Sequence, residues 1–504
     1  MKIPKVALLK AFTTIIINTL AMSLDARATS SDDWRYVSEG GATMVFSYIG
    51  SQSEDFSGMV LRLRKAHLSD LQNVGPSLSE DEEYAAELDD PTIAFQMHVT
   101  SRLLPPEHLP RLLACRVSYD LLSSLSRTSA LLRPAERSLK DTIDARRRRA
   151  VLATDLVGFG KSEADSAPRS FAVEIKPKWA FLPNPTYLSP DLRDVKTKYS
   201  RFVMHSHYRS VSKTDDDSNA GLSTYDPLDL FSRKEERIKL AVESLWDSWI
   251  SSGGSTNNLK VFVGGKTISP LPTLQVWGHF SVIANAYSYN RSVIEQDSTA
   301  RTLSPLVNSS DSGETSSLRD LRSPFVSRVT NLLVRSPLPA RIAQLQRTLD
   351  SLDIEGLYES WKRYHRSLQT SHDDASVPPL GDREPEPTLD EWETFAVTYL
   401  EKSAYSGENT GGDSSDGRTI SREELRYHIL AYLMSATFKD CSIILRLASA
   451  SASSSSHLGS PIEESVTAID LDPKSVHRLE KWRQLDRDIA ATYSKYLATL
   501  SNTP

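Results

Sequence analysis

The chain has 504 residues, which as a soft prior corresponds to about three folding units. Hydrophobic residues make up 39% and charged residues 25%, a balance that excludes a wholly disordered chain. The 59 lysines and arginines against 65 aspartates and glutamates give a net charge of −6, which argues against a generally basic nucleic-acid binder. The two cysteines, Cys115 and Cys441, exclude a disulfide framework and an all-cysteine zinc site.

The first 31 residues are set apart from the rest. Lys2, Lys5 and Lys10 precede an apolar stretch at 11–24, which is the outline of a targeting segment. Polar residues interrupt that stretch, so an N-terminal extension without a role is the alternative. No later segment reaches the roughly 20 apolar residues that a membrane-spanning helix needs, and we expect no membrane span.

The first half of the chain mixes strand and helix patterns. Residues 34–65 predict strands around a glycine turn, because β-branched and aromatic residues alternate there. The acidic stretch 79–90 is predicted as a loop. Leucines at helical spacing predict a helix over 103–127. Residues 171–183 predict a buried strand that runs into a turn.

The second half combines helix and strand patterns with polar stretches. We expect an amphipathic helix at 229–250, a short strand at 259–263, and a helix at 340–368 with the strongest apolar periodicity in the chain. Four polar stretches interrupt these elements and predict insertions with little burial; they are 295–317, 370–388, 405–418 and 449–460.

A glycine turn followed by a cationic strand forms the first candidate site. Gly40 and Gly41 lie between two predicted strands, where backbone amides can approach phosphate oxygens. The next strand carries Arg62 and Arg64 at alternating positions, and a basic residue on the third strand meets the nucleotide in kinase-like lobes. An ordinary hairpin with an exposed strand face is the alternative.

Two lysines separated by a proline form a more specific candidate. Lys176 and Lys178 flank Pro177 in an extended segment with apolar neighbours, and they repel each other unless an anion lies beside them. Polyphosphate is the anion that fits; two solvated surface lysines are the alternative. Farther along, His205 and Arg209 are four residues apart and share one face of a helix.

Two aspartates near the C-terminus complete the set. Asp440 and Asp470 each lie beside an apolar strand, where a carboxylate needs a cation or a metal. Phosphoryl transfer requires one carboxylate that accepts the hydroxyl proton and one that holds Mg²⁺. Lys474 and Arg478 are again four residues apart. A helix-capping role is the alternative for a single aspartate.

These segments together resemble the inositol-pentakisphosphate 2-kinase family, in a fungal form. They follow the family's order across residues 34 to about 490, and the Glu-Ile-Lys-Pro-Lys and Tyr-Asp-Pro-Leu-Asp-Leu-Phe-Ser segments are the most specific. The matching segments are 39–48, 60–65, 174–178, 181–183, 200–205, 225–232, 439–443 and 469–474.

The resemblance implies an α+β, two-lobed fold, distantly related to protein kinases, with the long polar insertions in the C-terminal lobe. It places the N-terminal lobe at 32–173 and the C-terminal lobe at 174–500, after a targeting segment or disordered extension at 1–31. It implies transfer of the ATP γ-phosphoryl group to the 2-hydroxyl of inositol 1,3,4,5,6-pentakisphosphate, giving inositol hexakisphosphate (phytate).

The resemblance also implies a role for each candidate residue. The catalytic residues would be Asp440 and Lys176, and the Mg²⁺ ligands Asp470 and Asp440. ATP would meet Gly40, Gly41, Ala42, Val45, Arg62, Glu174 and Asp470. The substrate phosphates would meet Lys178, His205, Arg209, Lys474, Arg478, Trp482 and one of Arg133 and Arg137; Trp482 stands where the family commonly has tyrosine.

The remaining expectations concern partners and alternatives. We expect a monomer that uses ATP and Mg²⁺, has no structural zinc and binds no nucleic acid stably. The arginines at 146–149 indicate either a solvated loop or a nuclear address, so we expect the nucleus or the cytoplasm, with an N-terminal targeting signal left open. A catalytically inactive inositol-polyphosphate-binding protein and an unrelated nucleic-acid-binding protein are the alternative functions.

Overall fold

The computed structural model describes residues 24–72, 79–158, 170–212, 224–270, 318–368, 377–405, 420–448 and 464–501. It divides into two compact units, and each is described by itself. The first comprises Met1–Met97, Pro110–Ser170 and Phe262–Thr267, and the second the rest of the chain. Residues 1–23 of the predicted targeting segment lie outside the described residues, as do the polar stretches at 295–317 and 449–460 and nearly all of 405–418. The last residues of the N-terminal segment are not a disordered extension, because Leu24–Asp25 form strand β1 and Ala26 is buried. The stretch at 370–388 is described from residue 377, and the prediction of little burial is wrong there, since Leu380 and Glu384 are buried.

The first unit is built on a seven-stranded sheet in the order β1-β5-β7-β4-β3-β2, with β6 paired to β4. The sheet confirms the strands predicted within 34–65, because these residues form β2, β3 and most of β4. The strands are β1 (Leu24–Asp25), β2 (Trp34–Glu39), β3 (Thr43–Tyr48), β4 (Met59–His67), β5 (Leu112–Arg116), β6 (Asp141–Ile143) and β7 (Arg149–Thr154).

The helices of the first unit correct two predictions. The acidic stretch at 79–90 is not all loop, since Ser79 and Glu82 form a capping box that begins helix α2 (Glu80–Ala86). The predicted helix at 103–127 is strand β5 followed by helix α5 (Tyr119–Ser129). Two shorter helices, α3 (Pro91–Phe95) and α6 (Ala135–Ser138), complete this set.

A second sheet has five strands in the order β10-β9-β8-β11-β12 and belongs mainly to the second unit; Phe262–Thr267, which hold the end of β9 and most of β10, are counted with the first unit. Strand β8 (Ser170–Ile175) confirms the strand predicted from residue 171, and β9 (Leu259–Val263) has the predicted bounds. The other strands are β10 (Lys266–Ile268), β11 (Ser442–Ala448) and β12 (Ser465–Ile469).

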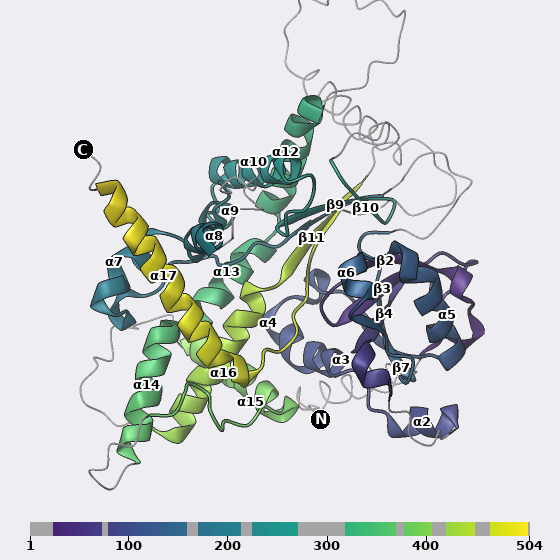
Figure 1. Cartoon of the computed structure of the whole chain (residues 1–504), viewed down its shortest axis with the longest axis horizontal. Coiled ribbons are helices and arrows are strands. Elements are labelled where there is room, and N and C mark those ends of the chain that lie inside the picture. The colour runs from purple at the N-terminus through teal and green to yellow at the C-terminus, as the bar shows by residue number, and fades with distance from the viewer. Residues whose placement is uncertain are drawn as a thin grey trace, which may run out of the picture. The chain divides into compact units, whose positions relative to one another are not determined.

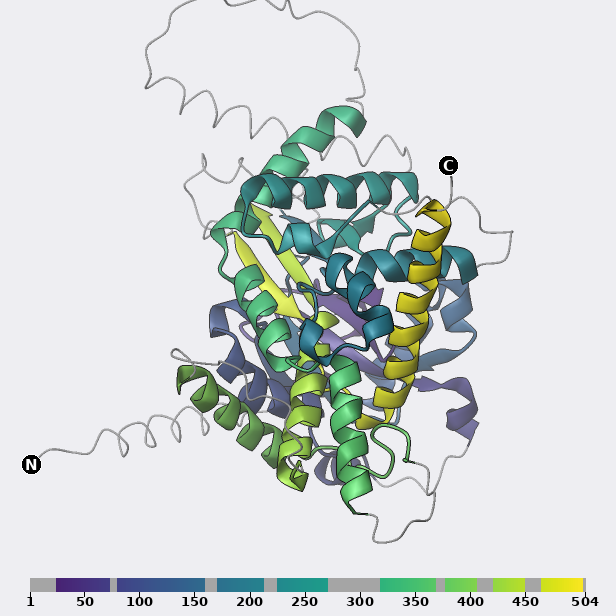
Figure 2. The same ribbon diagram turned by 90° about the vertical axis from the view of Figure 1, so that its left-hand side faces the viewer.

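Most of the second unit is helical (Figures 1 and 2). The long C-terminal helix, yellow in both views, packs along α7 and α8. The helices are α4 (Ser101–Leu103), α7 (Pro190–Lys198), α8 (Arg201–Ser212), α9 (Pro227–Leu230), α10 (Glu235–Ser251), α12 (Leu318–Arg335), α13 (Leu338–Leu349), α14 (Asp353–Ser367), α15 (Leu389–Tyr405), α16 (Arg422–Lys439) and α17 (Leu479–Ser501). Among the residues that the structure describes, no helix is long and apolar enough to cross a membrane.

Two predicted helices are interrupted. The helix predicted at 340–368 is α13 and α14, and the break at 350–352 ends at Asp353, whose φ of 60° is in the left-handed region. The helix predicted at 229–250 is the short α9 followed by α10, with Arg233 between them at a φ of 61°. In both places the apolar spacing continues across the break, so periodicity alone does not reveal it.

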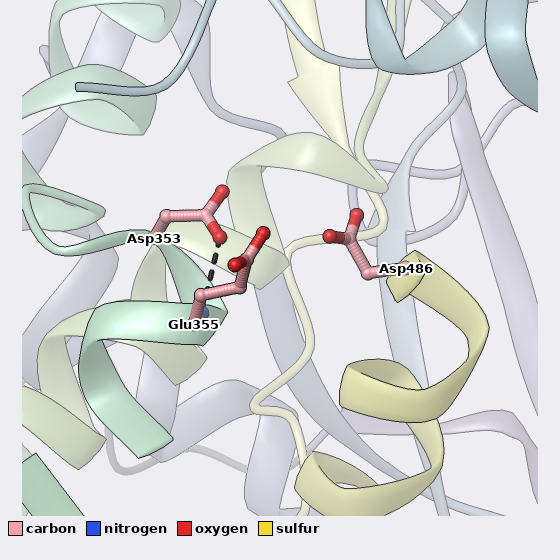
Figure 3. A group of neighbouring side chains, drawn as sticks. All are labelled: Asp353, Glu355 and Asp486. Atoms are coloured by element: carbon pink, nitrogen blue, oxygen red, sulfur yellow. Dashed lines mark hydrogen bonds between the residues drawn. The ribbon is translucent and has the colours of Figure 1, made fainter. Parts of the chain in front are cut away.

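A buried ion cluster joins three helices of the second unit. The carboxylates of Asp353, Glu355 and Asp486 point toward one another and lie close enough to hold a metal ion (Figure 3). The ammonium of Lys196, from α7, already lies 2.7 Å from Asp353, 2.7 Å from Glu355 and 2.8 Å from Asp486. Arg201 adds a second cation, 2.7 Å from Asp486. The cluster is therefore an ion network that fixes α7, α14 and α17 to one another.

We predict that Lys196→Met lowers the free energy of unfolding by about 3–5 kcal/mol, because it leaves carboxylates in the interior without their ammonium. Lys198→Met, two residues away, is the matched control; Lys198 forms an exposed pair with Asp194 at 3.7 Å and should cost less than about 1 kcal/mol. Urea unfolding of both variants measures the difference, and equal losses would contradict the prediction.

Candidate functional site

Three carboxylates come together at one end of the second sheet. Asp440 lies two residues before β11, and Asp470 directly follows β12. These strands are antiparallel, with Ser442 opposite Ile469, so both aspartates lie at the same end of the pair. Glu174, near the end of the adjacent strand β8, is linked to Asp470 through Ser442, whose hydroxyl lies 2.9 Å from Glu174 and 3.3 Å from Asp470.

The carboxylates of Glu174 and Asp470 lie in different surroundings. Glu174 is buried and pairs with Lys260 at 3.3 Å. Asp470 is half-buried and has a φ of 60°, a left-handed conformation that costs a non-glycine residue roughly 1–2 kcal/mol. Backbone strain of this kind clusters at functional sites, where the surrounding structure enforces it. The oxygen ligands that a hard divalent cation prefers are therefore present at the end of the sheet.

Asp440 lies beside two lysines. Its carboxylate accepts a hydrogen bond from Lys474 at 2.8 Å, and the Lys178 ammonium is 3.9 Å from its other oxygen. The Asp440 side chain is 61% exposed, whereas those of Lys178 and Lys474 are only 25% and 14% exposed. Asp440 therefore stays accessible to a ligand while both cations are partly withdrawn from water.

The charges around Asp440 and Lys178 favour the ionised form of the carboxylate and disfavour the protonated form of the lysine. Burial alone would raise the pKa of Asp440, but the charges of Lys474, Lys178 and Lys176 outweigh it and hold that pKa below its usual value. Burial lowers the pKa of Lys178, and the charges of Lys176 and Arg209 act in the same direction. An anion bound at this place would relieve that repulsion.

Helix α8 brings two further predicted residues to the same region. Burial lowers the pKa of His205 to about 4, and the charges of Arg201, Arg209 and Lys178 add to the effect. Arg209, one turn farther along the helix, is exposed. The predicted residues Lys176, Lys178, His205, Arg209, Asp440 and Lys474 thus act on one another electrostatically within the second unit.

Arg478 and Trp482 follow Lys474 along the chain. Arg478 is exposed at the end of a single 3₁₀ turn, Val476–Arg478. Trp482 is half-buried on α17, with its ring 6.3 Å from that of Tyr432. Their predicted contact with substrate phosphates stays a prediction.

The glycine turn lies in the first unit, between β2 and β3. The N–H of Gly40 donates to the carbonyl of Thr43 at 2.9 Å, which closes the turn. A Cβ built at Gly40 or Gly41 would meet nothing within 4 Å, and neither residue has a positive φ. The protein's own packing therefore does not require glycine here. Val45 and Arg62 lie directly opposite each other on β3 and β4, and Ala42 accepts from the N–H of Lys65 at 3.0 Å.

Burial distinguishes the two arginines that follow. The Arg133 side chain is 4% exposed, and its guanidinium lies 2.9 Å from Glu39 and 2.5 Å from Asp141. Lys65 pairs with the same two carboxylates, each at 3.0 Å. Arg137 is exposed and donates to the carbonyls of Glu39 and Gly40, at 2.7 Å and 3.2 Å. Arg133 therefore stabilises the unit, whereas Arg137 lies at the glycine turn.

Sequence reasoning did not single out the residues that support Asp440 and Asp470. Ser442 is a buried hydroxyl at the start of the apolar strand β11, a position where a polar residue signals a specific partner. Lys439 is also buried; its ammonium lies 2.5 Å from Asp350 and 3.8 Å from the centre of the Trp179 ring. The chain on both sides of Asp440 is thus fixed by buried polar contacts.

An ionised carboxylate beside lysines, with further cations and a second carboxylate nearby, defines a site for transfer of a group to or from a highly anionic substrate. The family model described as inositol-pentakisphosphate 2-kinase matches residues 36–488. The chain belongs to the inositol-pentakisphosphate 2-kinase family.

Relatives from fungi, plants and fish carry that family name. The chain is 30% identical to the inositol-pentakisphosphate 2-kinase of Cryptococcus neoformans var. neoformans serotype D over 473 residues, 92% of this chain and 93% of the relative. It is 26% identical to that of Arabidopsis thaliana, over 94% of this chain and 96% of the relative. It is also 26% identical to that of Danio rerio, over 67% and 71%. The chain is therefore similar to fungal, plant and fish members over most of their lengths.

We predict that binding of inositol hexakisphosphate takes up a proton at His205. The free imidazole is neutral above its pKa of about 4, and a bound polyanion stabilises the imidazolium and raises that pKa. This group therefore strengthens binding as the pH falls through the raised pKa of the bound imidazole, down to about 4. Calorimetry in buffers of different ionisation enthalpy counts the protons.

Two variants isolate the contribution of His205. His205→Gln should take up fewer protons than the wild type at about pH 5.5. His67→Gln, at an exposed histidine on β4, should match the wild type. Protonation of the phosphates is common to all three proteins and cancels in the comparison. Equal uptake by wild type and His205→Gln would remove His205 from the binding site.

Proposed function

We propose that this chain transfers the γ-phosphoryl group of ATP to the 2-hydroxyl of inositol 1,3,4,5,6-pentakisphosphate, forming inositol hexakisphosphate. The observation that carries the proposal is the Asp440 carboxylate beside Lys178 and Lys474, at the end of the sheet where Asp470 also lies. Membership of the kinase family supports the reaction class. The retained Asp440 and Asp470 argue against an inactive binding protein.

In this proposal Asp440 accepts the proton of the attacking hydroxyl. A carboxylate with a lowered pKa is ionised at neutral pH, so the acceptor is ready before the substrate arrives. Proton transfer from an alcohol to such a weak base is favourable only as the new O–P bond forms. The main catalytic contribution therefore comes from positioning and from charge neutralisation, as in other phosphoryl transfers.

The substrate's charge explains the need for many cations. Five phosphates at about −1.5 to −2 each give roughly −8 to −10. We assign Lys178, His205, Arg209, Lys474 and Arg478 to the substrate phosphates, and Lys176 to the phosphoryl group in transfer. Arginine adds bidentate contacts. Of the two arginines in the first unit, we favour Arg137, because it is exposed and Arg133 is engaged in a buried ion network.

The nucleotide and the metal complete the proposal. We assign the ATP contacts to Gly40, Gly41, Ala42, Val45, Arg62 and Glu174, and the open space beside both glycines supports this. Asp470, with Asp440, would hold Mg²⁺, which neutralises phosphate charge when bound. We further propose that the first unit is the nucleotide-binding lobe of a distantly protein-kinase-like fold, and that the enzyme acts as a monomer in the nucleus or the cytoplasm.

We predict that Asp440→Asn abolishes formation of inositol hexakisphosphate while the pentakisphosphate still binds. Asparagine is nearly isosteric but cannot accept the proton, and loss of a general base typically costs about 10²- to 10⁴-fold in rate. Anion-exchange chromatography of the products measures turnover, and calorimetry measures binding. Asp472→Asn, two residues beyond Asp470, is the control and should leave the rate within about twofold. Wild-type turnover by Asp440→Asn would remove Asp440 from the mechanism.

We predict that Lys474→Ala raises the KM for the pentakisphosphate at least about tenfold and flattens its dependence on salt. Each cation lost removes a charge-assisted contact and part of the long-range attraction. Lys481→Ala, at an exposed lysine on α17, is the matched control. The measurement is the slope of log KM against log salt concentration for each variant. An unchanged KM in Lys474→Ala would place the substrate elsewhere.

A further inference from the structure

Three consecutive backbone carbonyls behind the two lysines are each held by a side chain from a different part of the second unit. Lys176 O accepts from the amide of Asn258 at 2.9 Å. Pro177 O accepts from the hydroxyl of Tyr225 at 2.9 Å, and Lys178 O accepts from the amide of Gln346 at 3.0 Å. The path of the Lys176–Lys178 backbone is thus fixed by contacts that leave both ammonium groups available.

Gln346 differs from the other two because it also reaches the segment that carries Asp440. Its Nε2 donates to the carbonyl of Phe438 at 3.0 Å, and its Oε1 accepts from the N–H of Ala180 at 2.8 Å. Helix α16 ends at Lys439, and Asp440 is its C-cap. One side-chain amide therefore joins the backbone on either side of the Lys178–Asp440 pair.

The environment of Gln346 requires an amide. The residue is fully buried on α13. Two carbonyls face its nitrogen and an N–H faces its oxygen, which assigns the orientation of the amide. A methionine has a similar shape but makes none of these bonds and would leave three buried backbone groups unsatisfied. A glutamate keeps the acceptor and, when protonated, regains one donor.

The backbone of Gln346 is itself held in place. Its carbonyl accepts from the hydroxyl of Ser435 on α16 at 2.8 Å and from the N–H of Asp350 at 3.2 Å. Helices α13 and α16 pack directly against each other. The amide is therefore anchored to the same helix whose end carries Asp440, and it is not free to follow a movement of Lys178.

We propose that Gln346 is a positioning residue that fixes the Lys178 ammonium relative to the Asp440 carboxylate. Lys178 has a φ of 68°, a conformation that its own side chain disfavours and that the surrounding contacts must maintain. Loss of the Gln346 bonds lets the Lys178 backbone relax and alters the 3.9 Å separation of the pair. Misplacement by about 1 Å can lower a rate by roughly 100-fold. The inference rests on the roles proposed for Lys178 and Asp440.

The test compares Gln346→Met with Gln344→Met, an exposed position on the same helix. Gln346→Met should lower kcat roughly 10- to 100-fold with the KM for ATP within about twofold, whereas Gln344→Met should match the wild type. Leu345→Val controls for a general loss of core packing, since Leu345 is fully buried on α13. Equal kcat values for Gln346→Met and Leu345→Val would overturn the proposal.

A double-mutant cycle separates positioning from a merely structural role. If Gln346 acts through Lys178, then Gln346→Met should lower the single-turnover rate by less than about threefold in a Lys178→Met background. The full 10- to 100-fold loss in that background would overturn the proposal.

A second variant keeps the proposal testable if Gln346→Met does not fold. The activity of Gln346→Glu relative to wild type should rise as the pH falls from about 8 to about 6, because the protonated carboxyl regains a donor. A flat ratio would overturn the proposal.

A binding measurement distinguishes failure of this proposal from failure of the proposed function. If the wild-type chain forms no inositol hexakisphosphate, the proposed function fails. Calorimetric binding of inositol hexakisphosphate then decides the role of Gln346. Affinity at least about tenfold weaker in Gln346→Met than in Gln344→Met supports the positioning role of Gln346, and equal affinities overturn it.

Discussion

Cations that must lie close together before an anion arrives repel one another, and the second unit is arranged to withstand that repulsion. The charges of Lys176 and Arg209 lower the pKa of Lys178, and the charges of Arg209 and Lys178 lower the pKa of His205. Asp440 lies beside Lys178 and offsets part of the repulsion. The backbone at 176–178 keeps its position against the remaining repulsion, because surrounding side chains donate hydrogen bonds to three consecutive carbonyls. The binding energy of a polyanion can then go into neutralising charge instead of ordering the chain.

Both units hold the segments near their candidate residues with buried ion networks. In the first unit Arg133 and Lys65 share the carboxylates of Glu39 and Asp141, directly beside the glycine turn. In the second unit Lys196 fixes α7 to α14 and α17. Such networks add little net stability over an apolar core, but they are intolerant of the loss of a single member. Such networks favour the one conformation in which every buried charge has its partner over similar conformations in which a partner is missing.

The sequence was informative where a chemical requirement is local, and less so where the outcome depends on packing. The spacing of Lys176 and Lys178 predicted an anion site, and the order of the matching segments identified the family. Leu112 and Leu113 fit a helical period and a strand equally well, and only pairing with β7 decides between them. Arg133 and Arg137 carry the same charge, and burial alone separates them. Gln346 gave one weak signal, an amide among the apolar residues of α13.

Lys178 and Asp470 both occupy the left-handed region, with φ of 68° and 60°. Glycine or asparagine would fit either backbone position more easily than lysine, and neither could supply the ammonium of Lys178. Selection on melting temperature alone would therefore favour replacements at position 178 that remove a charge from the candidate site. Engineering for a higher melting temperature should therefore leave both positions unchanged and should screen for turnover as well as for folding. At these positions a substitution that raises stability is expected to lower activity.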